Sequence, residues 1–118
     1  MGNKNWVKVF SYAWSGVVYS IVTQRNMKVH LVAGATALLL AWFLVISPLE
    51  WAILVLTIAG VISAEIINTA LEAAVDLVSP EFHPLAKRAK DTAAGAVLIM
   101  ALASLAVAYI IFFKRLVG

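Results

Sequence analysis

The chain has 118 residues, of which 64% are hydrophobic and 13% charged, and its net charge is +3. Soluble domains are about 45–50% apolar and about 25% charged, so this composition predicts an integral membrane protein. The absence of cysteine excludes disulfides, thiolate metal sites and cysteine nucleophiles. The basic residues do not form the dense stripe that is typical of a nucleic-acid-binding protein, so no nucleic-acid partner is expected. The length predicts a single domain, residues 1–118.

The first predicted element is a helix over about residues 6–22. Lys4 and Lys8 mark its start, and its length carries many amphipathic rings. These rings are Trp6, Phe10, Tyr12, Trp14 and Tyr19. Such a segment more often lies in the membrane interface than crosses the bilayer. We therefore expect an interfacial amphipathic helix, with a short crossing helix as the competing interpretation.

Three further helices are predicted to span the membrane. Residues 31–49 and 92–113 carry no charge, and each segment has about the 20 residues that a spanning helix needs. Between them, residues 51–64 are apolar but too short to span alone. We therefore predict one long helix over residues 51–78, ended by Ser79-Pro80, because proline disfavours helical geometry in the residue before it. The expected fold is an all-α membrane protein.

The distribution of Lys and Arg predicts the orientation of these spans. Four basic residues precede the first span and three lie between the second and third, whereas the turn at residues 47–50 has none. The seven are Lys4, Lys8, Arg25, Lys28, Lys87, Arg88 and Lys90. By the positive-inside rule this side faces the cytoplasm. Lys114 and Arg115 oppose the assignment, which we retain because the first helix usually dominates.

Four polar residues share one face of the predicted helix 51–78. Measured from Glu65 at about 100° per residue, Asn68 lies at about −60°, Glu72 at about −20° and Asp76 at about +20°. A carboxylate within the bilayer costs about 2.5–3.5 kcal/mol on insertion scales, so three of them require partners such as metal ions, basic side chains or water. Such a stripe favours magnesium, which prefers oxygen ligands, and leaves one carboxylate as a base.

The alternative interpretation is a solvated helix end. It accounts for Asp76, but it accounts poorly for Glu65, which follows 14 apolar residues. Asn68 is equally compatible with an interhelical hydrogen bond.

The connection after this helix contains two prolines and is predicted to begin as a constrained loop. It continues with Lys87, Arg88 and Lys90, which are suited to phosphate oxygens and equally to topological anchoring. His83 alone is weak evidence, because a loop histidine is usually a surface residue. Glycine-rich phosphate-binding motifs are absent.

A long motif and a short one that follows it together resemble the signature of the prokaryotic diacylglycerol kinase family. They are Glu-Ile-Ile-Asn-Thr-Ala-Leu-Glu-Ala-Ala-Val-Asp at 65–76 and Ala-Lys-Asp at 89–91. The longer string at 83–99, which begins His-Pro-Leu-Ala-Lys, is most similar to the undecaprenol kinase branch, and residues 10–16 and 26–31 also fit. The resemblance implies a surface helix plus three spans, assembled as a homotrimer with active sites between subunits in the bacterial cell membrane. It implies transfer of the γ-phosphoryl group of ATP to a lipid hydroxyl, assisted by Mg²⁺.

The resemblance also implies roles for individual residues. Glu65 corresponds to the catalytic base and Glu72 to a metal-binding carboxylate. The positions associated with the nucleotide are Asn68, Asp76, Lys90, Asp91, Tyr12, Glu81 and His83. A second metal ligand, normally acidic, corresponds here to Gln24, whose amide offers a carbonyl oxygen without charge. We expect weaker metal binding and slower transfer, whether Gln24 is a natural variant or an engineered substitution.

Three alternatives accompany this interpretation. The lipid is most similar to undecaprenol by motif, and diacylglycerol remains an alternative because both present a primary hydroxyl at the interface. A weakened or inactive family member, retained for lipid binding or assembly, is the second alternative. The third is a small transporter in which Glu65, Glu72 and Asp76 form a proton or cation path; the neighbouring Lys-Asp pair fits that class poorly.

Overall fold

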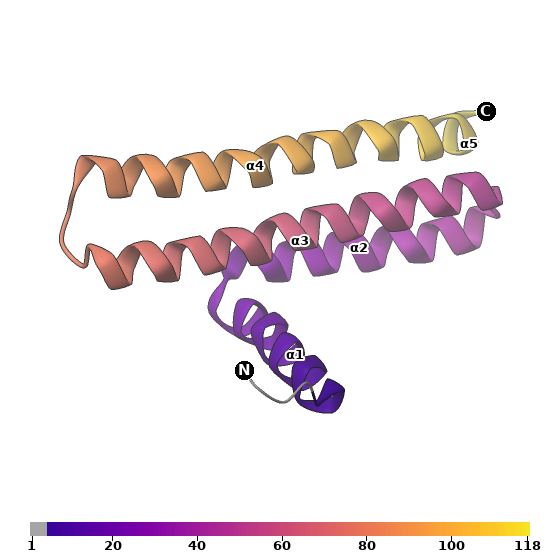
Figure 1. Cartoon of the computed structure of the whole chain (residues 1–118). Helices are drawn as coiled ribbons and strands as arrows, with labels where there is room; N and C mark the ends of the chain where they lie inside the picture. Colours follow the sequence, from indigo (N-terminus) through magenta and orange to yellow (C-terminus); the bar gives the residue numbers. More distant parts are fainter. Residues whose placement is uncertain (1–4) are drawn as a thin grey trace.

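The computed structural model describes residues 5–118, which form helices and no strand. The four long helices are α1 (Trp6–Thr23), α2 (Arg25–Leu44), α3 (Pro48–Val78) and α4 (Pro84–Ala108). A short π-helix, η1 (Tyr109–Phe113), and α5 (Lys114–Val117) continue the line of α4 (Figure 1). Three stretches are long and apolar enough to cross a membrane: Arg25–Leu44, Pro48–Val78 and Pro84–Val117. The predicted all-α class with three candidate spans is confirmed.

The first and last spanning helices begin and end at different residues from the apolar segments that predicted them, whereas α3 ends at Val78, where the predicted central helix ends. The first spanning helix runs from Arg25 to Leu44, where hydropathy marked 31–49. The last begins at Pro84, where hydropathy marked 92. The difference arises because hydropathy reports which residues suit hydrocarbon, whereas a helix continues through charged residues outside the bilayer until a cap ends it.

A tight turn joins α2 to α3. Val45 adopts a left-handed backbone with φ 54°, and its N–H donates to the carbonyl of Ala41. Ser47 then caps α3: its Oγ accepts from the N–H of Glu50 at 3.2 Å, and the Glu50 carboxylate accepts from the N–H of Ser47 at 3.1 Å. This reciprocal capping box, with Pro48 in the first turn, starts the helix immediately after the turn.

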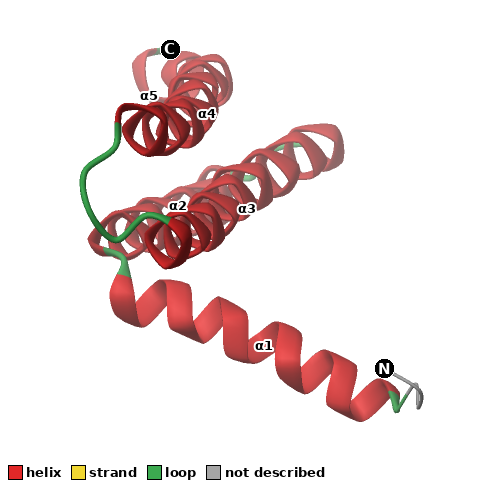
Figure 2. Cartoon of the chain, turned by 60° about the vertical axis from the view of Figure 1, so that its left-hand side comes forward, coloured by secondary structure: helices red, strands yellow, loops and turns green. Residues whose placement is uncertain are grey.

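The central helix of the molecule is α3, which packs against α4, α2 and α1. In Figure 1, α2, α3 and α4 run as long rods, whereas α1 leaves them at an angle. Figure 2 shows α1 pointing away from the other helices. Its hydrophobicity is also more one-sided than that of the other long helices, as expected of a helix at a membrane surface.

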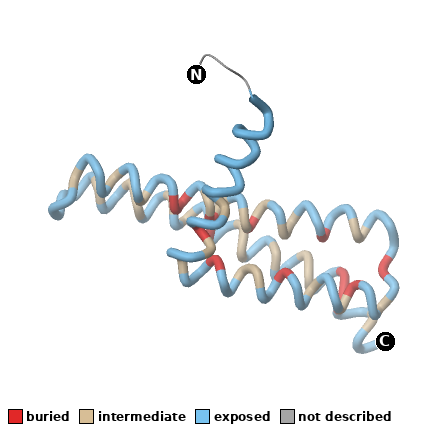
Figure 3. The backbone as a smooth tube through the Cα atoms, turned by 90° about the horizontal axis from the view of Figure 1, so that it is seen from below, coloured by how far each residue is buried: buried red, intermediate tan, exposed pale blue. Residues whose placement is uncertain are grey.

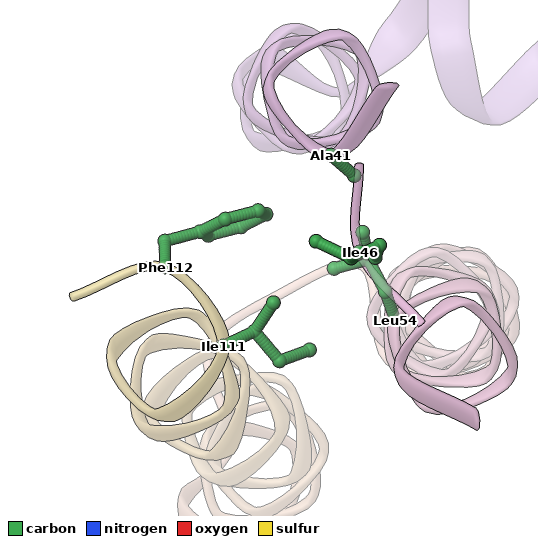
Figure 4. Close-up of a cluster of buried hydrophobic side chains, with 5 residues drawn as sticks. All are labelled: Ala41, Ile46, Leu54, Ile111 and Phe112. Carbon is green, nitrogen blue, oxygen red and sulfur yellow. The ribbon is translucent and has the colours of Figure 1, made fainter. Parts of the chain in front are cut away.

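A small apolar core lies at the end of the bundle opposite the α3–α4 loop. It brings together residues of α2, the following turn, α3 and η1 (Figure 4). They are Ala41, Ile46, Leu54, Ile111 and Phe112. Elsewhere most of the chain is exposed, and Figure 3 shows buried residues only at scattered points along the helices. Large exposed apolar side chains along all the spanning helices suit contact with lipid chains or with other copies of the chain.

The same end of the bundle carries a bidentate ion pair. Arg115 donates from Nη1 to Oε2 of Glu50 at 2.8 Å and from Nη2 to Oε1 at 2.6 Å. Both side chains are largely buried. The Arg115 charge, which opposed the predicted orientation, therefore has a structural partner on the same side of the molecule.

Candidate active site

The polar face predicted for the long central helix is present on α3, and burial varies along it. Glu65 is 1% exposed and Asn68 is 5% exposed. Glu72, one turn further on, is partly buried, and Asp76 is exposed. Asn68 connects the series, because its Nδ2 donates to Oε1 of Glu72 at 3.3 Å. The interpretation of the whole stripe as a solvated helix end is therefore wrong for Glu65 and Asn68.

Glu65 is a buried carboxylate without a hydrogen bond among the described residues. Both of its side-chain oxygens lack a partner, as does Oδ1 of Asn68. The nearest ionisable group is His30 of α2, whose Nε2 is 3.6 Å from Oε2 of Glu65. Burying a carboxylate without a hydrogen bond costs free energy, so Glu65 is a candidate catalytic residue.

A cavity of about 240 Å³ opens beside Glu65. Its polar side is formed by α2 and α3 and its apolar side by α4. The lining residues are Asn26, His30, Glu65, Asn68, Ala94, Val97, Leu98 and Ala101. His30 and Asn26 were not predicted as site residues. The signal that would have found them is their spacing of four, which places the two polar groups on one face of a predicted helix.

The backbone at Glu65 is tied to α1 through two hydroxyls. Thr69 donates from Oγ1 to the carbonyl of Glu65 at 2.8 Å, and Oγ of Ser20 is 3.0 Å from the same Oγ1. Because the single hydroxyl hydrogen of Thr69 is committed to Glu65, Ser20 must be the donor to Thr69. These two hydrogen bonds connect α1 to the turn of α3 that carries Glu65.

A second cavity, of about 350 Å³, lies at the α3–α4 loop. It brings together five of the seven predicted nucleotide-binding residues: Asp76, Glu81, His83, Lys90 and Asp91. Ser79, Pro80, Phe82, Ala86 and Lys87 complete the lining. The cavity contains both acidic and basic groups, which suits a nucleotide whose phosphates are neutralised partly by protein and partly by metal.

Two ion pairs and a helix cap organise this loop cavity. Nζ of Lys90 on α4 is 2.5 Å from Oδ1 of Asp76 on α3. Lys87 pairs with Asp91 one turn along α4, at 2.6 Å. Nδ1 of His83 accepts the N–H of Leu85 at 3.1 Å and so caps α4. The constrained loop predicted after α3 ends at His83, because Pro84 already occupies the first turn of the helix.

Three predicted site residues, Glu72, Tyr12 and Gln24, line neither cavity. Tyr12 is on α1 and is 67% exposed. Gln24 is the single residue between α1 and α2, is partly buried, and donates its backbone N–H to the carbonyl of Ser20 at 3.0 Å. Lys4, which was predicted to mark the start of the first helix, lies outside the described residues.

Within residues 5–118 there is no group of three or more His, Asp or Glu side chains that could hold a metal ion. The predicted ligands, Glu72 and Gln24, comprise one carboxylate and one amide. Mg²⁺ is commonly held by one or two carboxylates together with water and substrate phosphates. Glu72, whose Oε1 accepts from Asn68, could serve as one such carboxylate, and its role toward Mg²⁺ remains a prediction.

Comparison with known proteins identifies the family. The prokaryotic diacylglycerol kinase family matches residues 11–112. The undecaprenol kinase of Bacillus subtilis (strain 168) is 40% identical over 109 residues, which cover 92% of this chain and 89% of that protein. The diacylglycerol kinase of Synechocystis sp. is 45% identical over 104 residues, or 87% of this chain and 59% of that longer protein. The diacylglycerol kinase of Escherichia coli (strain K12) is 32% identical over 93 residues, which cover 79% of this chain and 76% of that protein. The chain therefore belongs to the prokaryotic diacylglycerol kinase family and is an ATP-dependent membrane lipid kinase.

Proposed function

We propose that this kinase transfers the γ-phosphoryl group of ATP to undecaprenol, giving undecaprenyl phosphate. The observation that carries the proposal is the Glu65 carboxylate, which is buried, has no hydrogen-bond partner among the described residues, and borders a half-apolar cavity. A carboxylate in that position can meet the hydroxyl group of a lipid whose chain remains in the membrane. The undecaprenol-type string at 83–99 and the 40% identical undecaprenol kinase support the choice of lipid.

In the proposed reaction Glu65 is the catalytic base. One of its oxygens takes the hydroxyl proton as the lipid oxygen attacks the γ-phosphorus, and the bond from that phosphorus to the ADP oxygen breaks. Phosphoryl transfer depends mainly on positioning and charge neutralisation, so a single well-placed base and a set of cationic groups are sufficient. Glu65 meets the requirement for positioning because it lies on α3, which packs against α1, α2 and α4.

The nucleotide is assigned to the loop cavity and to the α3 face that leads from it toward Glu65. The assigned residues are Asp76, Glu81, His83, Lys90 and Asp91 in the cavity, Asn68 on the face, and Tyr12 on α1. Mg²⁺, held by Glu72 and the Gln24 amide, would neutralise the phosphate oxygens during transfer. The ion pair between Lys90 and Asp76 then exchanges for contacts to phosphate and metal when ATP binds.

The site is assigned to the cytoplasmic face of the bacterial cell membrane. Arg25, Lys28 and the basic residues that begin α4 lie on the side that the positive-inside rule assigns to the cytoplasm. A homotrimer with active sites between subunits is also proposed, because the cavity beside Glu65 is open and its α4 wall includes exposed Ala94 and Leu98. Cross-linking of the purified protein in detergent tests the trimer.

Diacylglycerol is the second candidate substrate. It is favoured by the 45% identity to the diacylglycerol kinase of Synechocystis. Transfer of radiolabelled phosphate from ATP, measured in mixed micelles that contain either undecaprenol or diacylglycerol, decides between the two lipids. The proposal requires faster labelling of undecaprenol and loss of labelling in Glu65→Gln. Faster labelling of diacylglycerol refutes the lipid assignment, and activity that survives Glu65→Gln refutes the assignment of the base.

A further inference from the structure

His30 of α2 faces the proposed base across a buried gap. Its Nε2 is 3.6 Å from Oε2 of Glu65, and the two side chains are 17% and 1% exposed. Neither this nitrogen nor either carboxylate oxygen has a hydrogen-bond partner among the described residues. A potential donor and two unpaired acceptors therefore lie side by side in a region where an unpaired polar group is costly.

The other groups around Glu65 are poor candidates for this contact. The α4 wall of the cavity consists of apolar side chains: Ala94, Val97, Leu98 and Ala101. On α3, the Asn68 amide nitrogen donates to Glu72. From α1, the Ser20 hydroxyl reaches Thr69, which bonds the backbone of Glu65 and not its carboxylate. Asn26 lines the same cavity but is itself exposed.

Close packing of α2 on α3 sets the distance between the two side chains. Gly34 lies one turn after His30, and a Cβ atom at this position would be 3.1 Å from Cγ2 of Ile58 on α3. Glycine thus allows the two helix backbones to approach beside His30. A Cβ atom at this position would require the Ile58 side chain to shift by a few tenths of an ångström.

We propose that His30 is a positioning residue for Glu65: its Nε2–H donates to Oε2 and orients the carboxylate, so that Oε1 receives the proton of the lipid hydroxyl. This inference rests on the proposed function, because it assumes that Glu65 is the base. The separation of 3.6 Å is longer than a hydrogen bond. Catalytic hydrogen bonds are often long before substrate binds and shorten in the reacting complex. His30 keeps its own proton throughout, and the hydroxyl proton remains on Glu65 until product leaves.

Nitrogen NMR of the full-length protein tests the contact directly. The chain has two histidines, so protein labelled with ¹⁵N-histidine gives two imidazole signal sets, and His83→Gln assigns them. We expect His30 to carry a proton on Nε2 and its Nε2 signal to move in Glu65→Gln. A proton on Nδ1 alone, or an Nε2 signal that Glu65→Gln leaves in place, overturns the proposal. This readout does not depend on activity, so it stands even if Glu65 proves not to be the base.

A matched pair of amide variants tests the effect on catalysis. In His30→Gln the amide nitrogen is as many bonds from Cβ as Nε2 of histidine, whereas in His30→Asn it replaces Nδ1 and cannot reach Glu65. We expect His30→Gln to retain most of kcat and His30→Asn to lower kcat up to about 100-fold, the scale for a misplaced catalytic group. The KM for ATP should stay within about twofold in both. Equal activity of the two variants, whether both are high or both are low, overturns the positioning role.

Discussion

Lys90 of α4 and Asp76 of α3 form an ion pair of 2.5 Å across the cavity at the α3–α4 loop. Both side chains are substantially exposed. Exposed ion pairs contribute little to stability, since solvent screens the attraction and ordering two long side chains costs entropy. The pair therefore adds little to the stability of the fold, which leaves both side chains available for the nucleotide role proposed above.

The first prediction concerns Lys90. Lys90→Gln should raise the KM for ATP by about tenfold or more, the effect of losing one hydrogen bond to a charged group. The thermal unfolding midpoint should hardly change, because the pair with Asp76 is exposed. Kinetics over a range of ATP concentrations, together with thermal melts in detergent, separate the two effects. Lys114→Gln is the matched control, since it removes the same charge at the opposite end of the same span. A KM that does not move would remove Lys90 from the nucleotide site.

Gln24 gives the second prediction. Gln24→Glu should raise kinase activity and shift the Mg²⁺ titration to lower concentration, because a carboxylate binds a hard cation more strongly than an amide does. Gln24 suits this test because its hydrogen bond at the junction between α1 and α2, to the carbonyl of Ser20, comes from its backbone N–H, which the substitution retains. Gln24→Asn serves as a neutral control and should show no gain. If activity is the same over the whole Mg²⁺ titration, position 24 does not contact the metal.

The third prediction tests the ion pair between Arg115 and Glu50. Arg115→Met should lower the thermal unfolding midpoint by several degrees, because it removes two charge-assisted hydrogen bonds and leaves a largely buried carboxylate without its partner. Lys114→Gln, a change at the neighbouring position, should have little effect. Glu50→Gln combined with Arg115→Met should be less harmful than the sum of the two changes, because each removes the same pair. Additive losses would mean that the residues act independently.

The fourth prediction concerns the turn between α2 and α3. Val45→Gly should stabilise the protein by about 1 kcal/mol, because glycine adopts the left-handed conformation without the steric cost that a β-branched residue incurs. The Val45 side chain is exposed, so its removal forfeits little packing. Equilibrium unfolding in mixed micelles measures the change, and kinase activity should be unaltered because the turn is remote from both cavities. Val45→Pro is expected to be destabilising, since proline cannot adopt a positive φ. If Val45→Gly lowers the stability, the left-handed conformation of Val45 does not destabilise the protein.

Much of the fold followed from the sequence alone. Uncharged segments of about the right length indicated the spanning helices, and the helical period placed Glu65, Asn68, Glu72 and Asp76 on one face. These properties are local, because they depend on composition and on the geometry of a single helix. The end of the central helix at Val78 agrees with the prediction from Ser79-Pro80, whereas the starts of α3 and α4 differ from it, since they depend on the caps Ser47 and His83 and not on hydropathy. The catalytic, metal and nucleotide roles remain predictions.

The tertiary structure alone decided which residues meet across helices. His30 lies beside Glu65, Ser20 is linked to Glu65 through Thr69, and Arg115 pairs with Glu50. Each contact joins residues far apart in the chain, and each depends on how closely and at what angle two helices pack. Helical periodicity fixes the direction of a side chain around its own axis, but it does not determine which neighbouring helix that side chain faces. The sequence thus determined the acidic face of α3, and the packing of α1, α2 and α4 around it decided that Glu65 is buried while Asp76 is exposed.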